Sequence, residues 1–225
     1  MTVAVVFPWR GGQPERERHF EYVAEALHDM LPDAFHLDVD SAANPFSRAG
    51  SRNLGVAVAA SLKADVVVLC DADTIPEPEP LFAAIEGAKD GRLHLPYTHF
   101  RGLSPAGTFE YLRGKPAAEC HAELESDWST GGVWVLAPDA FVRSGGFDER
   151  FVAWGNEDCA GRICCDAILG PTVKHEGTIT HLWHPSAIDM TSDTWKANQA
   201  LGKRYDDAEG DLDAVKALIA ERGSA

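Results

Sequence analysis

The feature that most constrains the fold is an uninterrupted apolar run, Val66-Val67-Val68-Leu69-Cys70. β-Branched residues without polar interruption are typical of a strand that is buried on both faces. Such strands occur mainly in parallel sheets that helices cover on both sides, so the run predicts an α/β fold. The run ends in Asp71-Ala72-Asp73. In α/β sheets the active residues lie at the carboxyl ends of the strands, which makes this segment a candidate site.

The segments around this run alternate between strand and helix patterns. Val3 to Phe7 reads as a short apolar strand, and Glu15 to Leu31 carries apolar residues at helical spacing. Ser47 is expected to cap a second helix that reaches about residue 62. The apolar face of that helix is expected to hold Leu54, Val58 and Leu62.

The rest of the chain continues the alternation. The expected strands are 92–97, 133–136 and 178–183, and the expected helices are 81–88, 138–142, 156–169 and 212–221. Residues 98–128 mix Gly, Pro, aromatic and charged residues, and we expect a binding loop or lid there.

Composition narrows the class of protein. At 225 residues and 45% hydrophobic, the chain can bury one core, and no apolar run approaches the roughly 18 residues of a membrane span. A formal net charge of −15 disfavours nucleic-acid and anionic-membrane partners. The five cysteines show no C-x-x-C pair, and the N-terminus lacks the basic flank of a signal peptide. We therefore expect reduced thiols in a cytoplasmic protein.

Two groups of residues could hold a metal ion. Asp71 and Asp73 are two positions apart at a strand end, so both carboxylates can face one ion, and such oxygen ligands suit Mg²⁺ or Mn²⁺. A solvated turn is the alternative for this pair. His181 and His184 close the last expected strand, and imidazole beside carboxylate favours Mn²⁺. Each histidine taken singly also fits an ordinary surface or core position.

A third cluster, Trp154-Gly155-Asn156-Glu157-Asp158, precedes a helix. Its acidic residues could simply oppose the partial charge of the helix N-terminus, whereas Trp154 offers an apolar platform for a sugar face. Gly131-Gly132 allows close backbone approach to a ligand or forms a tight turn. Arg10 and Arg48 each follow an aromatic residue, as stacking on a base and pairing with phosphate would require.

The order of these motifs resembles that of the GT-A glycosyltransferases, most closely the β-1,4-galactosyltransferase group, with kinship to the polypeptide N-acetylgalactosaminyltransferases. The similarity runs over roughly residues 3 to 185. Its most specific part is the block from Gly131 to Asp158, which resembles the family's Gly-Gly to Trp-Gly-Gly-Glu-Asp block. The supporting matches are Val5–Arg10, Phe46–Ala49 with Asn53–Gly55, Asp71–Pro76, and His181-x-x-His184 in place of Met-x-x-His.

The resemblance implies one GT-A domain at 1–190, with a mostly parallel central sheet flanked by helices, and a C-terminal helical extension at 191–225 packed on it. It implies metal-dependent transfer of a sugar from a nucleotide donor, UDP being the family's usual nucleotide, with inversion at the anomeric carbon. The acceptor stays open among a saccharide, a protein, a lipid-linked sugar and a modified nucleobase.

The resemblance also implies a role for each candidate residue. Asp158 is the expected base, and Glu157 fixes the acceptor. The expected metal ligands for Mn²⁺ or Mg²⁺ are Asp73, Asp71, His184 and His181. The expected donor-binding residues are Pro8, Trp9, Arg10, Phe46, Arg48, Asp71, Gly132 and Trp154.

The chain departs from the family pattern at several positions. Asn156 replaces a Gly, Cys159 replaces a third acidic residue, and His181 replaces Met. The first two changes put the acceptor contacts in doubt, and the third changes the type of one metal ligand. The family's cysteine pattern and membrane anchor are also missing, which favours a cytoplasmic relative.

Three other readings compete. Asp71-Ala72-Asp73-Thr74 also fits the D-x-D-x-T motif of haloacid-dehalogenase phosphatases, although about 65 residues of α/β pattern precede it and no apolar strand leads into Asp206-Asp207. A nucleotidyltransferase would need a Gly-rich basic loop, for which Arg10-Gly11-Gly12-Gln13 is a poor substitute. A non-catalytic sugar- or partner-binding module would keep the fold without nucleotide binding.

Overall fold

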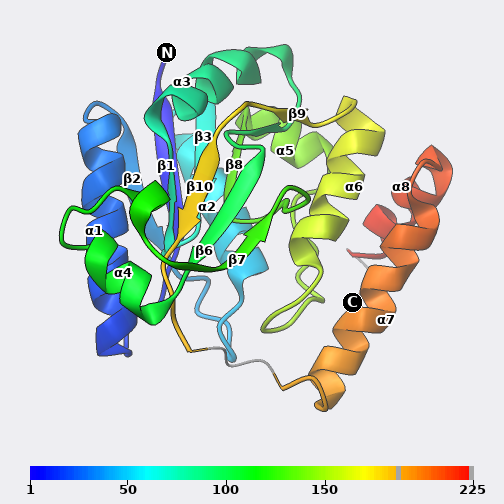
Figure 1. Ribbon diagram of the computed structural model, residues 1–225. Helices are drawn as coiled ribbons and strands as arrows, with labels where there is room; N and C mark the ends of the chain where they lie inside the picture. The colour runs from blue at the N-terminus through cyan, green and yellow to red at the C-terminus, as the bar shows by residue number, and fades with distance from the viewer. Residues whose placement is uncertain (186–188, 223–225) are drawn as a thin grey trace.

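A computed structural model describes residues 1–185 and 189–222 (Figure 1). Its main sheet has six strands in the order β2-β1-β3-β8-β5-β9. These strands are β1 (Val3–Pro8), β2 (Phe35–Val39), β3 (Val66–Cys70), β5 (His94–Leu95), β8 (Val133–Leu136) and β9 (Val173–Lys174). Because β8 runs antiparallel to both of its neighbours and the other pairs are parallel, the remaining strands share one direction. The predicted α/β fold with a mostly parallel sheet is confirmed.

Helices cover both faces of this sheet, and the strand residues divide between them. On β1, Val6 points into a core cluster with Val56 of α2 (Arg48–Ser61) and with α5 (Pro138–Arg143). The adjacent Val5 points into a second cluster with α1 (Pro14–Met30) and α3 (Pro78–Gly87). This alternation is the period of two of a strand that is buried on both faces.

A second, four-stranded sheet takes two of its strands from the region where we expected a loop. It has the order β4-β10-β6-β7, formed by β4 (Thr74–Pro76), β10 (Thr178–His181), β6 (His99–Leu103) and β7 (Ala122–Ser126). Helix α4 (Pro105–Tyr111) and the 3-10 turn η2 (Ala117–Glu119) lie between β6 and β7. Another 3-10 turn, η1 (Ala88–Asp90), directly follows α3. The prediction of an irregular 98–128 segment was therefore wrong. Edge strand β7 leaves Leu124 exposed, so the segment lacks the apolar alternation that would have revealed it.

Helix α2 begins where predicted but turns a different face inward. The hydroxyl of Ser47 accepts a hydrogen bond from the Gly50 amide at 2.9 Å, which confirms the predicted cap. Leu54 is 44% exposed, however, and Leu62 beyond the helix end is also exposed. The buried face carries smaller residues and Arg52, because a Cβ at Gly55 would already lie 2.2 Å from Val6 Cγ1. Because α2 packs closely on β1, Arg52 reaches Asp71 directly after the end of β3.

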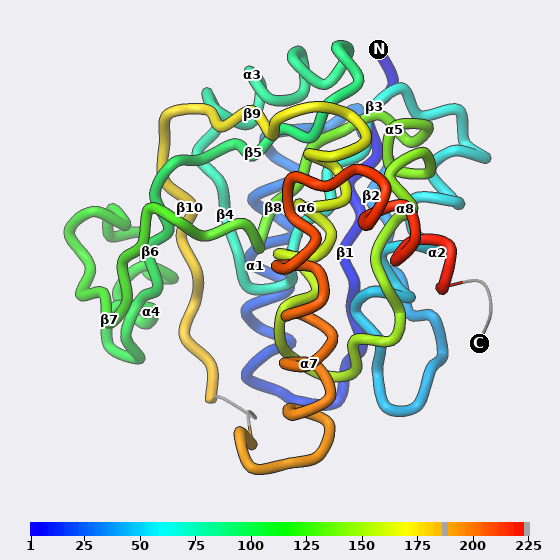
Figure 2. Tube along the Cα trace, turned by 90° about the vertical axis from the view of Figure 1, so that its right-hand side faces the viewer, coloured from blue at the N-terminus to red at the C-terminus, as the bar shows by residue number. Residues whose placement is uncertain are grey.

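Two C-terminal helices, α7 (Asp193–Ala208) and α8 (Leu212–Glu221), pack on α6 (Glu157–Leu169), as the turned view in Figure 2 also shows. A third core cluster joins them, with Ile163 from α6, Tyr205 from α7 and Leu218 from α8. The sequence predicted α8 within its observed bounds but missed α7. No helix in the described parts of the chain is long and apolar enough to cross a membrane.

Candidate functional site

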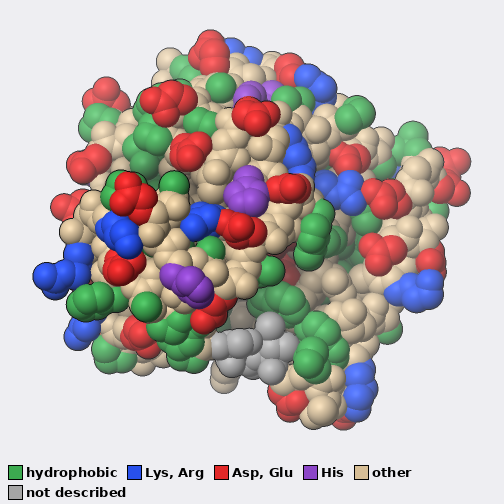
Figure 3. All heavy atoms as spheres, in the orientation of Figure 1, with side chains coloured by type: hydrophobic (Ala, Val, Ile, Leu, Met, Phe, Trp, Pro, Cys, Tyr) green, Lys and Arg blue, Asp and Glu red, His purple; other side chains and the backbone are tan. Residues whose placement is uncertain are grey.

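The candidate site lies where several chain segments end at the same edge of the main sheet. Strand β3 ends at Cys70, directly before Asp71, and the Asp71 amide donates to the Gly132 carbonyl at 2.8 Å. Because β8 is antiparallel, its beginning lies beside the end of β3. On the face seen in Figure 3, the molecule is hollowed between the second sheet and α7.

Asp73, His181 and His184 form a group that fits a metal ion. Their candidate ligand atoms all lie within 4.8 Å of one another, and Asp73 is only 7% exposed. The Asp73 carboxylate lies 3.6 Å from His181 Nε2 and 3.4 Å from His184 Nε2. The Leu182 amide donates to the Asp73 carbonyl at 2.8 Å, so the backbone fixes this juxtaposition. One carboxylate with two imidazoles is a ligand set that suits Mn²⁺ and related ions.

Burial and neighbouring charges shift the pKa values of Asp73 and His181. Burial by itself raises the pKa of Asp73, but His181, His184 and Arg16 together hold that pKa below its ordinary value. Burial also lowers the pKa of His181, which favours the neutral imidazole that a metal ligand requires. These side chains therefore present a carboxylate and a neutral nitrogen to the site.

Helix α1 contributes two residues that the sequence analysis did not single out. Arg16 Nη2 donates to Asp73 Oδ2 at 3.0 Å. His19 is buried, and its Nδ1 has no hydrogen-bond partner among the described residues. The signal was present as Arg16-x-x-His19, one helical turn apart, but it reads as an ordinary solvated helix face.

A buried arginine joins two of the predicted site residues. Arg52 is 3% exposed and donates to Asp71 Oδ1 at 2.5 Å and to Asp158 Oδ1 at 2.8 Å. Its guanidinium also stacks over the Phe147 ring at 4.7 Å. Asp71 is thus held by Arg52 and is not part of the Asp73 metal group within the described residues. Its role as a metal ligand stays a prediction.

The acidic pair predicted for catalysis stands in the first turn of α6. Glu157 accepts hydrogen bonds from the Arg48 guanidinium and from the Gly155 amide, the latter at 3.2 Å. Burial raises the pKa of Asp158 to about 6, although Arg52 opposes that rise. A Cβ at Gly131 would lie 2.6 Å from Asp158 Oδ2, so only glycine lets this loop pass the carboxylate. The structure therefore brings the Gly131 loop and Asp158 together.

Some of the residues predicted to bind the donor nucleotide lie at the end of β1 and just before α2. Arg10, which follows Pro8 and Trp9, lies 5.2 Å from the Phe46 ring centroid and pairs with Asp40 at 2.6 Å. The Trp9 indole stacks on Phe20 at 4.7 Å.

Two further donor-binding candidates are shaped by the loops that carry them. Gly132 has φ +93°, and a Cβ there would lie 2.9 Å from the Ile179 side chain. Trp154 is 48% exposed, so part of its ring is accessible to a ligand.

We compared the chain with protein families, with curated sequences and with solved structures. A family model described as the N-terminal domain of galactosyltransferase matches residues 114–161. No curated protein sequence matches the chain. Among the solved structures that resemble it are two of Drosophila β-1,4-galactosyltransferase 7. The catalytic domain in complex with xylobiose is 15% identical, with a TM-score of 0.56 over 88% of this chain and 79% of the other. A mutant in complex with manganese, UDP-Gal and xylobiose is 14% identical, with a TM-score of 0.54 over 87% and 79%.

The chain has the GT-A fold. The resemblance that the motifs predict is confirmed at this level, and the family match spans the block from Gly131 to Asp158. Within the GT-A fold, Asp206 and Asp207 lie in α7 and not at a strand end, so they cannot supply the later acidic pair of a haloacid-dehalogenase phosphatase.

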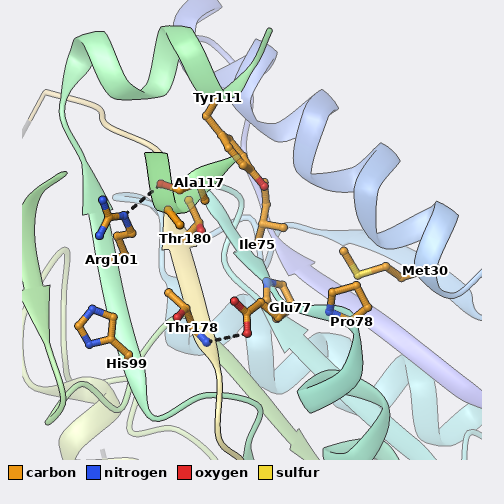
Figure 4. Close-up of a pocket in the computed structure, with 12 residues that line it drawn as sticks. Met30, Ile75, Glu77, Pro78, His99, Arg101, Tyr111, Ala117, Thr178 and Thr180 are labelled. Carbon is orange, nitrogen blue, oxygen red and sulfur yellow. Dashed lines mark hydrogen bonds between the residues drawn. The ribbon is translucent and has the colours of Figure 1, made fainter. Parts of the chain in front are cut away.

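One pocket of this GT-A fold lies apart from the candidate site (Figure 4). It has a volume of about 290 Å³ on the second sheet, where Thr180 and Arg101 line it. Because neighbouring residues of a strand point to opposite faces, Thr180 faces this pocket while His181 faces the metal group. The pocket therefore lies behind the strand that carries His181.

Proposed function

We propose that the chain is a metal-dependent glycosyltransferase that moves a sugar from a nucleotide donor, a UDP-sugar, to an acceptor hydroxyl with inversion. The observation that carries the proposal is that Arg52 bonds to both Asp158 and Asp71, so the acidic pair lies beside the segment that carries Asp73 of the metal group. A related structure contains manganese, UDP-Gal and xylobiose, which supports the same class of ligands here.

Asp73, His181 and His184 would hold a Mn²⁺ or Mg²⁺ ion, with Asp71 on the ion or on the donor ribose. When bound, the ion supplies Lewis-acid stabilisation of the negative charge on the departing diphosphate. In this proposal Arg10 and Arg48 pair with phosphate, and Trp9, Phe46, Pro8 and Gly132 border the nucleotide.

Asp158 acts as the base in this proposal. It takes the proton of the acceptor hydroxyl while the hydroxyl oxygen bonds to the anomeric carbon. The bond from that carbon to the diphosphate breaks, and its electron pair leaves on the phosphate oxygen. Glu157 fixes the acceptor, and Trp154 covers the donor and excludes water, which is a competing acceptor. Attack from the face opposite the leaving group inverts the anomeric carbon.

A thermal-shift screen of nucleotide sugars, with and without Mn²⁺, tests the proposal. A ligand at a hundredfold excess over Kd stabilises the folded state by about 2.7 kcal/mol. For a chain of this size, that corresponds to a rise in Tm of about 5–10 °C. The rise is expected only with metal and nucleotide sugar together.

The same screen separates the alternatives. Equal shifts with simple phosphoesters would favour a phosphatase, and no shift with any nucleotide sugar would favour a non-catalytic module. The donor sugar and its base follow from the nucleotide sugar that shifts Tm most. The five free cysteines, mostly buried, support a cytoplasmic location as part of this proposal.

The rate of sugar transfer is expected to rise with pH through about pH 6 and then level off. Asp158 must be ionised to accept a proton, and burial raises its pKa to about 6. Arg52→Gln removes a positive charge that lowers this pKa, so the rising limb of kcat/KM moves to higher pH. Arg52→Lys keeps the charge and keeps the limb in place.

Exposed Arg113 gives the matched control, since Arg113→Gln removes the same charge away from the site. A profile of kcat/KM with no limb near pH 6 would remove Asp158 from the base role. If the rising limb of the kcat/KM profile lies at the same pH in Arg52→Gln as in the wild type, Arg52 does not lower the pKa of the base.

A further inference from the structure

Helix α7 contacts the loop that carries Trp154, residues 151–156, although no motif of the sequence includes this helix. The loop leads directly into Glu157 and Asp158 at the start of α6. It includes Ala153 with φ +61° and Asn156 with φ +65°, which is an uncommon conformation for residues with a side chain. Contacts from other parts of the chain are needed to stabilise this loop conformation.

Asn198 of α7 supplies hydrogen bonds to the loop backbone. Its Nδ2 donates to the Val152 carbonyl at 2.7 Å and to the Trp154 carbonyl at 3.0 Å. Its Oδ1 accepts from the Val152 amide at 3.3 Å. Asn198 is 2% exposed, so losing its side chain would leave backbone groups buried without partners. An apolar residue would fill the space but could not hold the loop.

Trp195 and Gly202 add close packing on either side of Asn198. The indoles of Trp154 and Trp195 stack with ring centroids 5.5 Å apart and planes 10° apart. Only a glycine fits at position 202, because a Cβ there would lie 2.5 Å from Asn156 Nδ2. Every turn of α7 along the loop therefore contacts it.

The loop transmits this restraint to the acidic pair. The Gly155 amide donates to Glu157 Oε2 at 3.2 Å, and the Asn156 side chain donates to the Asn198 carbonyl at 3.4 Å. We propose that Asn198 and Trp195 are positioning residues, which hold the 151–156 loop and through it place Trp154 and Glu157. That they thereby serve sugar transfer rests on the proposed function.

A spectroscopic arm tests the positioning without any turnover. Two stacked indoles give an exciton couplet in the far-ultraviolet circular dichroism, which the wild-type protein should show. Asn198→Ala keeps both indoles but frees the loop, so the couplet should weaken strongly. Trp128→Phe removes an exposed indole outside the pair, and Lys196→Ala changes an exposed site on the same helix; both should keep the couplet. Thermal melts confirm that each variant is folded.

A kinetic arm measures hydrolysis of the nucleotide sugar, with water as the acceptor. Because Trp154 excludes water while the loop is held, Asn198→Ala and Trp195→Ala are expected to raise the rate of this hydrolysis severalfold. The Kd for UDP with Mn²⁺, measured by calorimetry, should not change. Trp195→Phe lacks the couplet but keeps an aromatic ring on Trp154, so its hydrolysis rate should stay close to that of the wild type.

The two arms separate failure of this inference from failure of the proposed function. If the wild-type protein binds no UDP and hydrolyses no nucleotide sugar, the transferase proposal is wrong, and the couplet alone decides the positioning. A missing couplet in the wild type, or an undiminished couplet in Asn198→Ala, would overturn the positioning. A wild-type rate of hydrolysis in Trp195→Ala would overturn its link to transfer.

Discussion

Asp158→Asn is expected to lower the rate of sugar transfer by about 10²- to 10⁴-fold, the usual contribution of a general base. The amide has nearly the same shape, and its oxygen can still accept the hydrogen bond that Arg52 donates at 2.8 Å. It cannot take a proton from the acceptor. The measurement is UDP release from the nucleotide sugar at saturating donor, where kcat falls while the Kd for UDP with Mn²⁺ is unchanged.

Asp139→Asn is the matched control for this variant, because Asp139 lies on the exposed side of α5 and its side chain is 77% exposed. The same chemical change there should leave kcat as in the wild type. Correct folding with near-normal transfer by Asp158→Asn would show that another group accepts the proton. Glu157, which is already bonded to Arg48 and to the Gly155 amide, would then be the next residue to test.

The parts of the fold that could be predicted from the sequence are those where burial leaves a regular pattern. Strands β3 and β8 have the predicted bounds, since all of their residues are buried and apolar. The second sheet could not be predicted in this way, because its strands are short and β7 exposes most of its side chains. Helix α7 was missed because its buried residues include Asn198 and Gly202, which carry no apolar periodicity.

Some residues of the candidate site could also be predicted from the sequence, and others could not. Motif positions such as Asp73, His181 and Asp158 could be predicted because their residue types are those of the chemistry. Arg52 could not, since an arginine in a helix is usually on the surface. Its position four residues after Arg48 was the available signal, because residues four apart share a helix face. Long-range contacts, like that between Asn198 and the Trp154 loop, leave no local pattern at all.

Asp73→Ala is expected to weaken Mn²⁺ binding by more than about 10²-fold, a larger loss than altered partners of metal ligands produce. Asp73 is the one carboxylate of the three-residue metal group in the described chain, and without it two imidazoles face the cation with no negative charge beside them in that group. Electron paramagnetic resonance of free Mn²⁺, in titrations with and without UDP, measures the affinity directly. In the wild type, EDTA should remove the ion and abolish the sugar transfer, and added Mn²⁺ should restore the transfer.

Histidine variants locate the ion within the group. His181→Ala and His184→Ala should each weaken Mn²⁺ binding, whereas His99→Ala should not. His99 borders the pocket on the other face of the second sheet, so it controls for loss of an imidazole from the same sheet (Figure 4). Equal Mn²⁺ affinity in all four variants and the wild type would contradict the metal group. Weaker binding in His184→Ala alone would leave Asp73 and His184 as ligands and assign His181 to packing against Phe100, whose ring centroid lies 5.6 Å away.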